Sequence, residues 1–132
     1  MITISKIYEG MFDYVQSVVG NAVDNRIFSC PEAPQDTPLP YLLFFTTGDN
    51  RDYFMGNDNS SVDIDFQVSI FTEKVVEDGD LNAIEIGDLI ISGEKDVYVE
   101  NMSNPLLRYR GGFERVSDDY IQKIIILNLK GF

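Results

Sequence analysis

The sequence predicts an α+β fold: a single domain, residues 1–132, in which a mostly antiparallel sheet of about five or six strands packs against two helices. Three observations lead to this prediction. The 132 residues suffice for one hydrophobic core and are too few for two. Apolar residues recur at spacings of three and four near the N-terminus but alternate strictly near the centre. Of all residues, 44% are hydrophobic and 12% aromatic, which is typical of a folded domain.

The first expected element is an amphipathic helix with Ser5 as its N-cap. Its apolar positions lie on one stripe and are Ile7, Tyr8, Met11, Phe12, Val15, Val18, Val19 and Ala22. Ile27 and Phe28 are then expected to form a short edge strand.

A proline-rich segment follows, with four prolines in ten residues at positions 31, 34, 38 and 40. Each proline fixes φ and lacks a backbone N–H donor, so the segment should cross the surface extended and lead into a strand over Tyr41 to Thr47.

The segment from Gly48 to Ser61 is rich in turn-forming residues and predicts a long hairpin connection. Its centre carries Tyr53, Phe54 and Met55, which is unusual for a solvated tip. Two interpretations remain open. The three side chains fold back onto the sheet, or they anchor a partner, because aromatic residues and methionine are enriched at interfaces.

The clearest strand runs from Val62 to Ile70, where apolar residues alternate with Asp63, Asp65, Gln67 and Ser69. One face of this strand should meet the core and the other should meet water or a polar partner. Asp63 and Asp65 share the polar face, so they are candidate interaction residues and, in a rival interpretation, a carboxylate pair.

The second half of the chain predicts one helix and three strands. Asp80 is the expected N-cap of a helix that ends near Gly93, and the strands are expected over 97–99, 108–116 and 120–130. Leu42 to Phe45 and Ile124 to Leu127 are apolar at every position. Either helices cover both faces of these two strands, or a neighbouring subunit covers one of them.

Residues that carry common catalytic chemistry are scarce. The chain has no histidine, and its one cysteine, Cys30, therefore has no imidazole to activate it as a nucleophile. Asp78, Asp80 and Asn82 resemble the start of a calcium loop, but Ala83 and Leu89 stand where that loop needs glycine and glutamate. We therefore expect no enzyme, with no catalytic residues, no metal site and no cofactor.

The net charge of −12 is unevenly distributed. Residues 49–100 hold 14 acids against 3 bases, a net of −11, whereas residues 101–132 hold 3 acids against 5 bases, a net of +2. Free nucleic acid is not an expected ligand, because sequence-independent affinity for it comes from phosphate neutralisation by lysine and arginine. The acids either keep the domain soluble or let opposite poles stack between copies.

The order of these elements, with the Pro34-Gln-Asp-Thr-Pro-Leu-Pro-Tyr41 loop before an apolar strand, resembles the tail terminator family. These proteins are also called tail completion or minor tail proteins of long-tailed phages and prophages. The resemblance implies an α+β subunit that forms a hexameric ring on the finished tail tube, stops tube polymerisation and offers the surface that joins the head.

The implied partners are further copies of the chain, the tail tube protein and a head–tail connector protein, while DNA passes through the ring without specific binding. The implied location is the host cytoplasm during assembly and then the tail of the virion, with no membrane contact, since the chain has no apolar run of about 20 residues. Two alternatives remain: another head-to-tail joining (neck) adaptor, or a small-ligand binding or enzymatic domain that uses Asp63 and Asp65.

Overall fold

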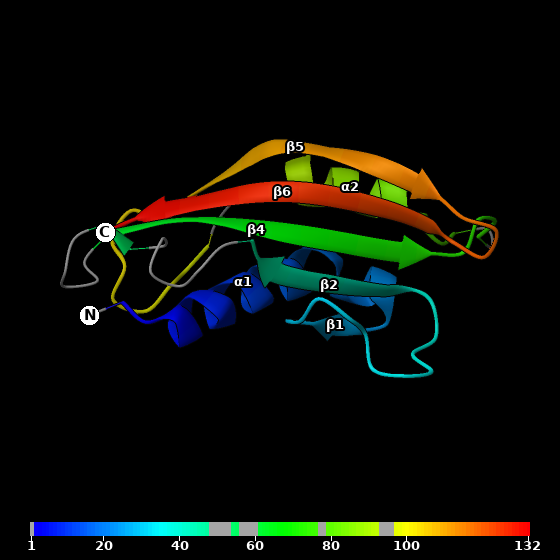
Figure 1. Cartoon of the computed structure of the whole chain (residues 1–132), viewed down its shortest axis with the longest axis horizontal. Coiled ribbons are helices and arrows are strands. Elements are labelled where there is room, and N and C mark those ends of the chain that lie inside the picture. Colours follow the sequence, from blue (N-terminus) through cyan, green and yellow to red (C-terminus); the bar gives the residue numbers. More distant parts are fainter. Residues whose placement is uncertain (1, 48–53, 56–60, 77–78, 93–96) are drawn as a thin grey trace.

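A computed structural model describes residues 2–47, 54–55, 61–76, 79–92 and 97–132 of the chain (Figure 1). Helix α1 spans Ile4–Val19 and continues as a short 3₁₀ turn over Gly20–Val23. The N-cap expected at Ser5 is wrong. Thr3 is the cap, because its backbone is extended and its hydroxyl oxygen accepts the Lys6 N–H at 3.3 Å.

Helix α2 spans Ala83–Ser92 and begins after Asn82. The Asn82 side chain accepts the Glu85 N–H at 2.9 Å, and the Glu85 carboxylate accepts the Asn82 N–H at 3.3 Å. This reciprocal capping box satisfies two N–H groups that the first turn of a helix leaves free. The cap predicted at Asp80 is therefore wrong by two residues.

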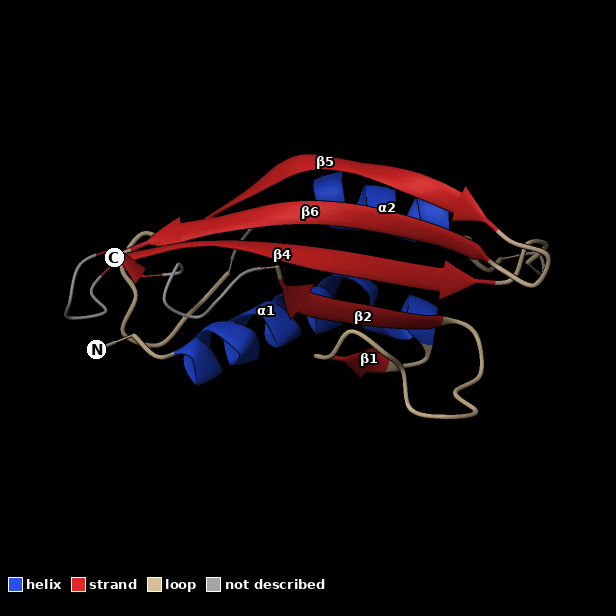
Figure 2. Cartoon of the chain, in the orientation of Figure 1, coloured by secondary structure: helices blue, strands red, loops and turns tan. Residues whose placement is uncertain are grey.

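Six strands form one sheet (Figure 2). The strands are β1 (Ile27–Phe28), β2 (Tyr41–Thr46), β3 (Phe54–Met55), β4 (Ser61–Thr72), β5 (Leu106–Val116) and β6 (Ile121–Gly131). Five of them follow one another in the order β1-β2-β4-β6-β5, and β3 pairs with the start of β4. All pairings are antiparallel except that of β1 with β2. The predicted α+β fold is confirmed.

The strand predicted over 97–99 is wrong. Val97 and Val99 are buried and Tyr98 is exposed, so the segment has the alternation of a strand without its pairing. It packs against α1, where a Cβ on Gly10 would collide with the carbonyl oxygen of Tyr98. The glycine therefore allows a close approach between the helix and this segment.

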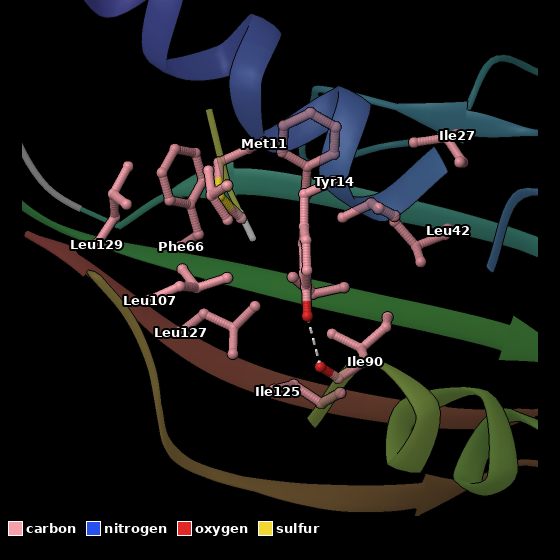
Figure 3. Close-up of a cluster of buried hydrophobic side chains, with 14 of the residues drawn as sticks. Met11, Tyr14, Ile27, Leu42, Phe66, Ile90, Leu107, Ile125, Leu127 and Leu129 are labelled. Atoms are coloured by element: carbon pink, nitrogen blue, oxygen red, sulfur yellow. Dashed lines mark hydrogen bonds between the residues drawn. The ribbon is translucent and has the colours of Figure 1, made fainter. Parts of the chain in front are cut away.

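Both helices lie on one face of the sheet, as Figures 1 and 2 show. Their buried side chains meet those of the strands in one apolar core around Met11, Phe66 and Leu127 (Figure 3). The Tyr14 hydroxyl on α1 donates a hydrogen bond of 2.8 Å to the Ile90 carbonyl near the end of α2. This bond joins the two helices and satisfies a carbonyl group in the last turn of α2.

Candidate interaction surface

The sheet face that points away from the helices is called the open face here. Along the strands its side chains alternate with those of the core, and paired residues of neighbouring strands share it. Its members include Phe28 on β1; Tyr41, Leu43 and Phe45 on β2; Asp63, Asp65, Gln67, Ser69 and Phe71 on β4; Gln122, Ile124, Ile126, Asn128 and Lys130 on β6; and Leu106, Arg108, Phe113 and Arg115 on β5. No helix among the described residues covers this face, which decides against two helical layers over the strands.

Asp63 and Asp65 lie on the open face as predicted, on either side of one amide. The Asn128 side-chain N–H group donates to Asp63 Oδ1 at 2.7 Å and to Asp65 Oδ1 at 2.8 Å. Lys130 Nζ lies 3.7 Å from Asp63, and Arg110 Nη1 lies 3.5 Å from Asp65. Each carboxylate is therefore hydrogen-bonded and has a cation nearby, so the cluster is well suited to hold neighbouring strands in register.

The aromatic residues of the long connection are only partly placed. Phe54 and Met55 form strand β3, whose backbone pairs with Val62 and Ser61 at the start of β4. Tyr53 and the side-chain positions of Phe54 and Met55 lie outside the described part of the structure. The two interpretations of these side chains therefore both stand.

A groove lies between the proline loop and the open face. Sequence patterns did not predict this groove. It has a volume of about 430 Å³, and its walls include Glu32, Asp36, Tyr41, Leu43 and Phe71. Tyr41 stacks on Phe71 with ring centroids 4.8 Å apart. Burial and the nearby hydroxyl of Tyr120 raise the pKa of Tyr41. The floor of the groove is thus neutral and aromatic, while its loop side carries two exposed carboxylates.

Strand β5 forms the edge of the sheet opposite β1 and is the most exposed long strand. Phe113 is 51% exposed and Val116 65% exposed, values that are high for apolar side chains. Arg108, Arg110 and Arg115 all lie on this strand, so it carries the basic pole that the charge distribution indicated. An edge strand also presents unpaired backbone groups, which makes it a place where another chain can pair.

One ion pair lies on the helix side of the sheet. The buried Lys123 ammonium is 2.7 Å from the Glu114 carboxylate on β5, and this hydrogen bond lowers the pKa of Glu114. The stem of Lys123 passes under Gly87 of α2, where a Cβ would lie 2.8 Å from Lys123 Cγ. The glycine therefore leaves room for the lysine, and the pair is part of the packing between α2 and the sheet.

Other candidate sites are limited. A second hollow, of about 540 Å³, lies beside the end of α1 and is lined by both polar and apolar residues, among them Asp24, Pro40, Glu73 and Leu81. The described residues contain no group of three or more histidine, cysteine, aspartate or glutamate side chains that could hold a metal ion. Within the same residues, no helix is both long enough and apolar enough to cross a membrane.

Comparison with known proteins gives the fold and no function. No family model matches the chain, and no curated protein matches it. Fifteen chains among solved structures match. One of them shares 12% sequence identity with a TM-score of 0.64, and the match covers 100% of this chain and 97% of the other. The name of that protein states no function. At this identity the likeness supports the α+β architecture over the full length of the chain.

Proposed function

We propose that this protein is a structural component of a phage virion that caps the tail tube as a ring, stops tube polymerisation and offers a surface for joining the head. In this proposal the chain acts in the host cytoplasm during assembly and then remains in the tail. Its partners are other copies of itself, the tube protein and a connector protein.

The observation that carries the proposal is the sheet with helices on one face only. The open face and the β5 edge present Phe113, Val116 and three arginines, an arrangement suited to contacts between subunits. The uncovered face also fits the alternative in which a neighbouring subunit covers one side of the apolar strands. The order of elements resembles that of the tail terminator family, and this resemblance supports a ring on the tail tube as the particular assembly.

The acidic character of the chain has a role in this proposal. A ring on a tail tube surrounds the path of the DNA, and negative charge on its surface keeps the duplex from adhering, since like charges repel. The net charge of −12 supplies such repulsion.

The direct test uses tail tubes assembled without a terminator. Addition of the purified protein should give rings at one end of each tube in negative-stain images and should stop further growth when tube protein is supplied. Six copies per ring are expected. Tubes that keep growing from both ends, with no added density at either, would contradict the proposal.

The same assay separates a neck adaptor from a terminator. A neck adaptor should bind isolated heads or connectors and leave the tube ends bare, whereas a terminator should bind the tubes without any head component. Binding to heads alone would therefore replace the proposed function with head-to-tail joining.

A further inference from the structure

Two opposite edges of the open face carry features that complement each other. The groove lies beside the proline loop, over β2 and β4 and toward the β1 edge, and the exposed Phe113 and Arg115 lie on β5 at the other edge. In Figure 1 the proline loop and the carboxyl end of β5 lie at the same end of the sheet.

The strand register places these features in the same rows of the sheet. One row runs from Tyr41 through Phe71 and Gln122 to Arg115. The next runs from Leu43 through Ser69 and Ile124 to Phe113. A second copy placed beside the first, with no shift along the strands, would therefore bring its β5 edge to the level of the groove.

The charges at the two edges are opposite. Glu32 and Asp36 are exposed on the loop side of the groove, and no cation among the described residues forms an ion pair with either. Arg115 is exposed and, within the same part of the chain, has no carboxylate partner; Asp118 and Asp119 in the following turn do not pair with it. A guanidinium group with five N–H donors suits two nearby carboxylates.

The apolar parts also match. Phe113 is half exposed on the open face, and the groove offers the stacked rings of Tyr41 and Phe71. Aromatic rings attract each other in edge-to-face and offset arrangements beyond the gain from buried area, and such pairs often anchor interfaces.

We propose that Phe113 and Arg115 of one copy dock into the proline-loop groove of the next copy, with Phe113 against Tyr41 and Phe71 and Arg115 between Glu32 and Asp36. The contact joins two different surfaces, so it is heterologous and generates a ring when the rotation between copies closes. The inference rests on the proposed function, in which copies form such a ring, and it adds the surfaces that meet.

Charge exchange tests the contact. Arg115→Glu should weaken self-association about tenfold or more, because it places like charges together. The double variant Glu32→Arg with Asp36→Arg should weaken it similarly. The triple variant that combines all three changes restores opposite charges at every contact and should recover association. Sedimentation velocity over a concentration series measures each variant, and the ring count on tube ends gives a second reading.

The matched control is Arg108→Glu, which makes the same charge change on the same strand and face but in the row of Asn128. It should have a clearly smaller effect than Arg115→Glu. Equal losses from the two variants, or a triple variant as weak as Arg115→Glu, would overturn the proposed contact.

A covalent test identifies the surfaces directly. In a Cys30→Ser background, Glu32→Cys with Arg115→Cys should give a ladder of disulfide-linked multimers after oxidation of concentrated protein, while Glu32→Cys with Arg108→Cys should give little. No ladder from the first pair would overturn the contact. If rings still form on tube ends in that case, the proposed function stands and only the interface is wrong. If a ladder forms but the protein never binds tubes, the interface stands and the function is wrong.

Discussion

The two faces of the sheet are built by the same strands but differ in what covers them. On the helix side, β4 places Val62, Ile64, Phe66, Val68 and Ile70 in the core, all essentially inaccessible to water. On the open face, the same strand places two aspartates, a glutamine, a serine and a phenylalanine. The two helices cover the first face, whereas no helix among the described residues covers the second, where the strands bury side chains such as Ser69 and Ile124 only against one another.

The largest expected effect is a difference in stability between variants at two neighbouring residues of β4 that lie on opposite faces of the sheet. Phe66→Ala should lower the free energy of unfolding by about 3 to 5 kcal/mol, because it leaves a cavity in the core. Gln67→Ala, on the open face, should change it by about 0.5 kcal/mol or less. Denaturant titration of both variants measures the contrast. Equal losses would show that the faces do not differ as the structure indicates.

A smaller loss is expected at Asn128, which links Asp63 and Asp65 on the open face. Asp63 and Asp65 both accept a hydrogen bond from the Asn128 side-chain amide. Asn128→Asp puts a third carboxylate in the place of this amide. The change should cost about 2 to 3 kcal/mol at neutral pH, because it removes two hydrogen bonds to charged groups and adds repulsion. Part of the loss should be recovered by adding Asp63→Asn to the same chain. An unchanged melting temperature for Asn128→Asp would mean that the cluster does not order the open face.

Loss of the hydrogen bond between the two helices should lower the free energy of unfolding by about 1 to 2 kcal/mol. Tyr14→Phe keeps the ring and removes the hydroxyl that donates to the Ile90 carbonyl, so a buried acceptor loses its partner. Tyr98→Phe is the control, since Tyr98 is 77% exposed. Thermal unfolding of the two variants should show a clear loss only for Tyr14→Phe. Similar melting temperatures would mean that apolar packing alone holds the two helices together.

The smallest effect is a change in pH dependence. The pKa of Glu114 is lowered from its ordinary value of 4.5 by the hydrogen bond from Lys123. A carboxyl group with a lower pKa in the folded state contributes stability that is complete above the unfolded pKa and is lost as pH falls through the folded pKa. The melting temperature of Glu114→Gln should therefore fall less between neutral pH and the region below 4.5 than that of the parent.

Local patterns in the sequence predicted most of the fold. Strict alternation identified β4, and spacings of three and four identified α1, because both signals repeat over many residues. Caps were less well predicted, since Thr3 and Ser5, or Asp80 and Asn82, are equally suitable by residue type. The segment 97–99 was misread because Val-Tyr-Val alternates like a strand, while its packing against Gly10 depends on tertiary structure.

The candidate surface was predicted only in part. Asp63 and Asp65 were identified because they share a polar strand face. Their partner Asn128 is more than 60 residues away in sequence and meets them only because β6 lies beside β4. The groove was missed for a similar reason, since the return of the proline loop toward Tyr41 leaves no periodic signal. Contacts between distant segments depend on strand order, which one sequence does not encode locally.

The bulge in β5 decides which residues of that strand point outward. Between Tyr109 and Gly111 the pairing with β6 skips one residue, and Gly111 has a φ of +148°, which glycine adopts readily. If this extra residue were paired with β6 instead of bulged, the alternation beyond it would invert. Phe113 would then turn toward α2, and Glu114 would leave Lys123 for the solvent side. A single bulged residue thus sets the parity of the strand, so a change at Gly111 that favoured regular pairing over the bulge would exchange the residues on the open face for those on the helix side, with no residue added or removed.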